Sequence, residues 1–197
     1  MSLRDLLKDM GRLETNLQRF ESQSPSRSKP IWNSPMLDPL ASPGAYEAFI
    51  YALPDRYASI RRSTLVYIAS GSLFGRVEGR IFFAGDIVLC VQEFLNFELN
   101  VIEGYGYEVS RPRDSLEGQR APATDEYCQA SYPNKEKLYW YDSFPHPNDP
   151  SLASTDPHHK HIPSDIKRHR VPAPDMSFTR PNLSFLIEEI AQQVLPE

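Results

Sequence analysis

The sequence predicts an α+β fold in which helices back an antiparallel sheet. Residues 76–83 alternate in side-chain character, with Val77, Ile81 and Phe83 on one face, which is the period of a β-strand. Residues 87–97 begin apolar on both faces, as a central strand does. Near the C-terminus, apolar residues are spaced as one face of a helix, at Leu183, Leu186, Ile187, Ile190 and Val194. We therefore expect a curled antiparallel sheet of about five or six strands, backed by a C-terminal helix, with another helix appended at the N-terminus.

Three regions are expected along the chain. Residues 1–22 space their apolar side chains at helical intervals with charges between them, which predicts an amphipathic helix. Residues 23–44 are rich in Ser and Pro and are predicted to be a linker without regular structure. Residues 45–197 then form the α+β domain. The N-terminal helix is expected to pack on this domain or on a second copy of the chain, which would give a homodimer.

Local signals set the expected order of elements within the domain. A short helix is expected over residues 45–53, ended by Pro54, and residues 57–110 are expected to form antiparallel sheet. The junction at residues 84–86 predicts a hairpin turn. Further strands are expected at residues 101–109, 127–131 and 137–142, and residues 111–135 are expected to be an insertion loop. Pro181 favours the start of the final helix, because proline suits a first helical turn.

Composition excludes several classes of protein. The net charge is −5 and the isoelectric point is about 5.6, which argues against a general nucleic-acid coat protein. Cys90 and Cys128 are too few for a disulfide framework, and Cys90 is expected to be a small core residue. No apolar stretch approaches the roughly 18 residues that cross a membrane, and the N-terminus lacks the apolar core of a signal peptide. A cytoplasmic protein is expected.

All five histidines fall between His146 and His169. Imidazole is the side chain best suited to proton transfer and metal binding near neutral pH. Prolines interrupt this segment, so we expect a surface loop, with neither helix nor central strand, that displays its side chains. Residues 146–170 hold four Lys or Arg against three Asp, so this segment is less acidic than the remainder of the chain taken together. The alternative interpretation is a solvated connection whose histidines only cap strand ends.

Two other features of the sheet involve acidic side chains. Glu93 lies within an apolar strand, and a buried carboxylate needs partners. Tyr105 and Tyr107 share one face of the next strand with Glu103, which indicates either a functional surface or a solvated face.

The strings at residues 139–142, 145–147 and 157–161 read YWYD, PHP and PHHKH, and the terminal helix follows them. Together with the order of the strands, they resemble the TumE family of bacterial and archaeal toxins over about residues 45–195. The resemblance implies a toxin held silent by a helix-turn-helix antitoxin. Pro147 departs from the family, which has a second histidine there, and residues 1–44 and 111–125 have no counterpart in it.

The resemblance and the chemistry of the side chains together nominate a set of site residues. Two histidines facing a phosphodiester can act as general base and general acid, while a lysine stabilises the developing charge, so RNA cleavage through the 2′-OH needs no metal. Aromatic and basic side chains would bind the RNA. The expected catalytic residues are Asp142, His146, His158, His159, Lys160, His161 and Glu93. The expected substrate-binding residues are Tyr105, Tyr107, Tyr139, Trp140, Tyr141, Lys167, Arg168 and Arg170.

We expect the segment 146–161 to fold back so that His146, Asp142 and the group at residues 158–161 share one cleft. No cofactor is expected. The chemical alternative is a divalent metal, because His159 and His161 would point the same way if that piece were extended. The functional alternatives are a non-catalytic module that binds protein or nucleic acid, and a regulatory subunit assembled through the N-terminal helix.

Overall fold

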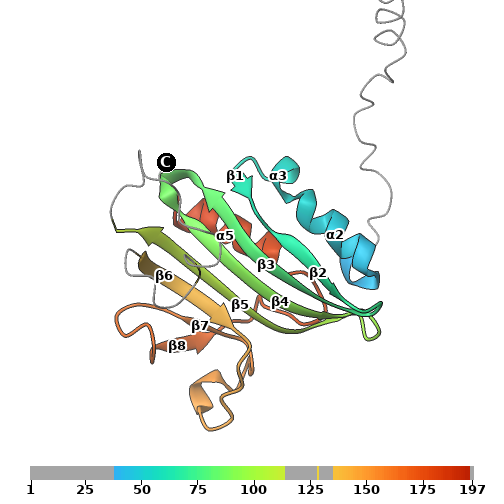
Figure 1. The fold of residues 1–197 in the computed structure, drawn as a ribbon. Coiled ribbons are helices and arrows are strands. Elements are labelled where there is room, and N and C mark those ends of the chain that lie inside the picture. The colour runs from blue at the N-terminus through green and yellow to red at the C-terminus, as the bar shows by residue number, and fades with distance from the viewer. Residues whose placement is uncertain (1–37, 114–127, 129–134, 196–197) are drawn as a thin grey trace, which may run out of the picture. The chain divides into compact units, whose positions relative to one another are not determined.

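The structure is a computed structural model that describes residues 38–113, 128 and 135–195, and it consists of one antiparallel sheet with helices on one of its faces (Figure 1). The sheet has eight strands in the order β1-β3-β4-β5-β6-β7-β8, and β2 pairs with β3 next to β1. The strands are β1 (Ile60–Ser63), β2 (Val66–Ser70), β3 (Phe74–Phe83), β4 (Val88–Asn96), β5 (Val101–Pro112), β6 (Lys135–Asp142), β7 (His159–His161) and β8 (Arg170–Pro172). The predicted α+β class is confirmed.

The helices in the described residues are α2 (Pro43–Tyr51), α3 (Leu53–Arg56) and α5 (Leu183–Gln193), with 3-10 turns η1 (Pro39–Ala41), η2 (Ala84–Asp86) and η3 (Pro150–Leu152). The prediction that Pro54 ends the first helix is wrong: α2 already ends at Tyr51, and Pro54 lies in the first turn of α3. None of the helices in the described ranges is long and apolar enough to cross a membrane.

The first described residues belong to the domain. Leu40 in η1 is fully buried, and the Ser42 hydroxyl caps α2 by accepting the backbone N–H of Ala45 at 3.2 Å. These residues had been placed at the end of the linker. The helix expected in residues 1–22 and most of the linker lie outside the described residues. Both stay predictions, and so does the homodimer that this helix would form. The strand expected at residues 127–131 also lies outside the described residues, apart from Cys128.

The hydrophobic core lies between the sheet and α2 and α5, on what we call the helix face; the opposite side of the sheet is the open face (Figure 1). Alternate residues of each long strand contribute to it, as the period of two predicts. The fully or almost fully buried members from β3, β4 and α5 include Val77, Ile81, Phe83, Leu89, Leu95, Leu186, Ile187 and Ile190.

A β-bulge in β5 decides which side chains of that strand are buried. The register with β4 shifts between Phe94 and Leu95, so Ile102 faces the core, Glu103 is exposed, and the core face resumes at Tyr105. Tyr105 and Tyr107 are 5% and 1% exposed. The interpretation of a solvated tyrosine face is therefore wrong.

The two cysteines are joined in a disulfide, which the sequence analysis did not predict because two cysteines are too few for a disulfide framework. Cys90 lies on the open face of β4 and forms a disulfide with Cys128, 38 residues later in the chain, with Cα atoms 5.7 Å apart. Cys90 is buried, but it packs with Val88 and Phe82 in a second small cluster outside the main core. Sequence spacing could not show the pairing, because two cysteines so far apart meet only through the fold.

The histidine segment also differs from the prediction. His159–His161 form β7, which pairs with β6 on one side and with β8 on the other, and are therefore not a loop at the surface. The prolines that argued against a strand are Pro157 and Pro163, which flank β7 and leave its own backbone N–H groups free to pair. Strands β7 and β8 account for the difference between the eight strands observed and the five or six predicted.

Glu93 lies in the core and has the partners that its burial requires. The Tyr107 hydroxyl donates to Glu93 Oε1 at 2.6 Å, and the Tyr46 hydroxyl of α2 donates to Oε2 at 2.7 Å. The Asn182 amide, next to α5, donates to the Tyr107 oxygen at 3.3 Å. Burial raises the pKa of Glu93 to about 7, although the two tyrosine hydrogen bonds act in the opposite direction. Burial, and then the charge of Glu93, raise the pKa of Tyr46.

We predict that Gly79→Ala destabilises the domain. Gly79 has φ +135°, and a Cβ there would collide with the backbone oxygen of Thr64, where the chain passes from β1 to β2 across β3. The expected loss is about 1–3 kcal/mol in the free energy of unfolding, measured by chemical denaturation. Gly106→Ala is the matched control, because a Cβ in that strand would meet nothing within 4 Å. Equal losses in the two variants would contradict this explanation.

We also predict a pH-dependent cost from Glu93. Its pKa is about 7 in the folded chain against 4.5 unperturbed, so the folded state holds a proton that the unfolded state has lost between these values. Stability should therefore fall as pH rises through this window. Relative to wild type, Glu93→Gln should gain roughly 3 kcal/mol between pH 4 and pH 8, since a pKa unit corresponds to about 1.4 kcal/mol. A difference between the two proteins that does not change with pH would contradict the assignment.

Candidate functional site

Strand β7 divides the histidine segment between the two faces of the sheet. It pairs with β6 so that His161 lies opposite Trp140 and His159 lies opposite Asp142. Because side chains alternate along a strand, these four residues share the open face, while Lys160 points to the helix face. The pairing brings together side chains that are far apart in the chain.

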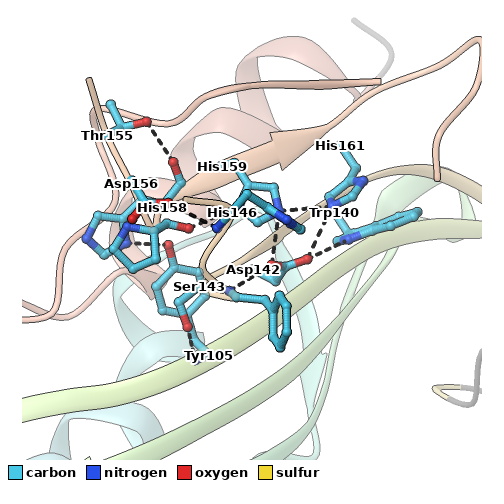
Figure 2. A network of polar contacts seen from close by, with 12 residues as sticks. Tyr105, Trp140, Asp142, Ser143, His146, Thr155, Asp156, His158, His159 and His161 are labelled. Atoms are coloured by element: carbon cyan, nitrogen blue, oxygen red, sulfur yellow. Dashed lines mark hydrogen bonds and ion pairs between the residues drawn. The ribbon is translucent and has the colours of Figure 1, made fainter. Parts of the chain in front are cut away.

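Asp142, His159 and His161 form a compact cluster on the open face (Figure 2). His159 Nε2 lies 3.0 Å from Asp142 Oδ1, and His161 Nε2 lies 3.3 Å from Oδ2. The two Nε2 atoms are 3.0 Å apart. The histidine side chains are almost completely buried, whereas that of Asp142 is 26% exposed, so solvent reaches the cluster from the carboxylate side.

Backbone groups orient both histidine rings. His159 Nδ1 lies 3.0 Å from the carbonyl oxygen of Pro157, and His161 Nδ1 lies 2.9 Å from that of Ile166. A carbonyl oxygen only accepts, so each Nδ1 carries a proton and donates it. Each Nε2 is therefore the atom that faces the cluster, and it carries a proton only if its ring is cationic.

Asp142 is held by two donors that come from its own strand and the following turn. The Trp140 indole N–H donates to Asp142 Oδ2 at 3.1 Å, and the Phe144 backbone N–H donates to Oδ1 at 3.0 Å. The indole ring also stacks on the His161 ring, with centroids 4.1 Å apart and planes at 21°. Trp140 thus fixes both an acid and an imidazole of the cluster.

His146 and Arg170 lie at the rim of the cluster. The His146 ring packs edge-on to His159 with centroids 4.7 Å apart, and its backbone N–H donates to the Asp156 carboxylate at 3.1 Å. Ligand atoms of His146, His159 and Asp142 all lie within 4.8 Å of one another. Arg170 lies opposite His161 in β8, and so on the same face. Phe144, 68% exposed, contacts His146 at 5.6 Å between centroids and was not anticipated from the sequence.

The pKa shifts within the cluster differ in direction from one residue to the next. Partial burial would raise the pKa of Asp142, but hydrogen bonds from His159, His161 and Phe144 hold it far below its ordinary value. Burial would lower the pKa of His159, yet its bonds to Asp142 and the Pro157 carbonyl raise it. Desolvation, and then the charge of Arg170, lower the pKa of His146.

His158 and Lys160 are not part of this cluster, although both were expected in the same cleft. His158 Nδ1 lies 2.8 Å from the Tyr105 hydroxyl, and the His158 ring packs against Phe178. Desolvation lowers the pKa of His158. Lys160 Nζ donates to Glu189 of α5 at 2.7 Å and lies 3.9 Å from the centroid of the Tyr139 ring. The expected single cleft is therefore wrong for these two residues and right for Asp142, His146, His159 and His161.

The aromatic residues expected to stack RNA bases also divide between the faces. Tyr139 and Tyr141 are buried on the helix face, where Tyr141 donates to Glu189 at 2.8 Å. Burial and the nearby carboxylate of Glu189 raise the pKa of both tyrosines. Burial, and then the charge of Asp142, raise that of Tyr105. Of the strand residues 139–141, Trp140 is the one on the open face.

The remaining expected residues lie outside the cluster. Glu93 belongs to the core network described above, together with Tyr107. Lys167 and Arg168 are exposed in the connection from β7 to β8, beside His169, whose Nδ1 lies 3.2 Å from the Pro163 carbonyl. These exposed basic residues are available to a partner, but they do not shape the cluster.

A hollow on the open face leads away from the cluster. Its volume is about 700 Å³, and it extends from β6 across β5 and β4 to β3. Its charged and polar lining includes Glu78, Gln92, Glu108, Lys137, Trp140 and Asp142. Asp142 and Trp140 thus belong both to the cluster and to the hollow, so a ligand in the hollow would meet the exposed side of the cluster.

The chain matches a known protein family over most of its length. A profile of this family, described as toxin TumE, matches residues 52–194, which include β1 to β8, α3 and α5. No curated protein and no solved structure matches the chain. The matched range contains every residue of the cluster.

Proposed function

Because this chain belongs to the TumE toxin family, we propose that it is a toxin that acts as an endoribonuclease at the Asp142–His146–His159–His161 cluster. Membership makes it the toxin component of a toxin–antitoxin system, so its partner is an antitoxin. That the antitoxin is a DNA-binding helix-turn-helix protein is part of the proposal and follows from the family resemblance.

The observation that carries the ribonuclease proposal is the convergence of imidazole and carboxylate groups at a solvent-reachable point of the open face. His146 is the least buried imidazole there, and its ring contacts His159. We assign proton transfer from the 2′-OH to His146, since general base catalysis requires a ring that the substrate can reach. His159 and His161 form the fixed floor against which the phosphodiester lies, and Asp142 orients them.

Arg170 takes the charge-stabilising role that the sequence gave to Lys160. The Lys160 ammonium is paired with Glu189 on the helix face, so it cannot face the same phosphate as His159 and His161. Arg170 lies on the cluster side of β8, and its charge is felt by both His146 and His159. A guanidinium is suited to binding phosphate oxygens in a bidentate manner.

We predict that His159→Ala and His161→Ala each abolish growth inhibition on expression of the toxin without its antitoxin. These two rings form the floor that positions the phosphodiester, and misplacing the reacting groups costs roughly a hundredfold in rate, so cleavage of RNA by the purified variants should fall at least that far. His169→Ala is the control, because His169 is an exposed histidine of the neighbouring connection. A variant lacking both His159 and His161 that still inhibits growth and cleaves RNA would refute the proposal.

Substitutions of Lys160 and Arg170 should have different effects, the first on stability and the second on RNA cleavage. Lys160→Met leaves the buried Glu189 without its ion pair and should lower the free energy of unfolding by about 3 kcal/mol, while the cleavage rate of the folded fraction changes little. Arg170→Gln should lower the cleavage rate and weaken RNA binding. Denaturation curves and initial rates on one RNA measure both effects. A Lys160→Met protein of normal stability that has lost cleavage would return the phosphate role to Lys160.

A further inference from the structure

We propose that Asp142, His159 and His161 bind a divalent transition-metal ion, Zn²⁺ being the species that the ligand set fits best. The inference goes beyond RNA cleavage and does not depend on it, since it concerns which ion these side chains bind. The sequence alone had favoured chemistry without a metal.

The first argument is the direction of the lone pairs. Both Nδ1 atoms donate to backbone carbonyls, so both neutral rings present an Nε2 lone pair to the cluster. These lone pairs lie 3.0 Å from each other and 3.0 and 3.3 Å from the two oxygens of Asp142. Four acceptor atoms thus converge, and a buried acceptor without a donor is costly.

Protons satisfy this arrangement poorly. A single Nε2 proton can be donated to the other Nε2 or to Asp142 but not well to both, and the cationic ring that it creates is buried. Two protons make both rings cationic, with their Nε2 atoms 3.0 Å apart in a buried site, where like charges repel strongly. A single divalent cation satisfies both nitrogens and the carboxylate together, and it lies between them as one charge.

The distances and the surrounding groups also fit a metal. Zinc binds imidazole nitrogen and carboxylate oxygen at about 2.0–2.2 Å, so neighbouring ligands of a tetrahedral ion lie roughly 3.3 Å apart. The two Nε2 atoms are 3.0 Å apart, and they lie 3.0 and 3.3 Å from different oxygens of Asp142. Each histidine donates its other N–H to a backbone carbonyl, and Asp142 accepts from Trp140 and Phe144, which are the second-shell contacts that orient metal ligands.

The fourth position lies on the side from which solvent reaches Asp142. His146 borders this position, with a ring nitrogen within 4.8 Å of the ligand atoms of Asp142 and His159. Three protein ligands with an open fourth position are the pattern of catalytic rather than structural zinc. Imidazole with carboxylate also suits Ni²⁺ and Cu²⁺, which the same assay can compare.

The test is metal binding by the untagged full chain. After incubation with Zn²⁺ and dialysis against chelator-treated buffer, we expect about one Zn²⁺ per chain by elemental analysis and a higher melting temperature with the ion. His159→Ala, His161→Ala and Asp142→Asn should each weaken binding at least tenfold by titration calorimetry. His158→Ala and His169→Ala are the controls, since these histidines lie outside the cluster, and they should bind as wild type does.

A measurement on the wild type keeps the proposal testable even if the variants do not fold. In long-range ¹H–¹⁵N spectra of the histidine rings, Zn²⁺ should shift the Nε2 signals of two buried histidines and leave their Nδ1 protons in place. The proposal is overturned if the folded wild type binds no Zn²⁺ at micromolar concentration. It is also overturned if the three cluster variants bind as wild type does. Binding of Zn²⁺ without any RNA cleavage would support the site and refute the ribonuclease, and the reverse result would refute only the metal.

Discussion

The pairing of β7 with β6 is the interaction on which the site depends. Three residues between two prolines become a strand because β6 and β8 supply hydrogen-bond partners on both sides. The alternation of that strand then sends His159 and His161 to one face and Lys160 to the other. A shift of one residue in this register would exchange the two sets and bury the histidines against α5, so the site exists only in the observed register.

Buried ionisable groups lie on both faces of the same strands, and the two sets differ in their hydrogen-bond partners. On the helix face, Glu189 accepts from Tyr141 and pairs with Lys160, while Glu93 accepts from Tyr46 and Tyr107. Every such carboxylate has found a donor, as burial requires. On the open face, the Nε2 atoms of His159 and His161 face acceptors. This contrast distinguishes a site that can take up a ligand from networks that only stabilise the fold.

Trp140 connects the strand, the cluster and the neighbouring hollow. Its indole donates to Asp142, stacks on His161 and lines the hollow that crosses the open face. A rigid aromatic ring in this position holds the acid and the imidazole in place and forms part of the wall of the hollow. The same residue therefore relates the proposed binding of RNA to the geometry of the groups proposed to cleave it.

The sequence by itself determined the α+β class, the long strands and the importance of the histidine segment, because period-two alternation and residue type are local properties. It also nominated Asp142, His146, His159 and His161. Only the tertiary structure decided that His159–His161 form a strand, that Lys160 and His158 face away from the cluster, and that Cys90 meets Cys128. The physical reason is that strand pairing, register and bulges depend on partners distant in the chain, and these alone determine which face a side chain occupies.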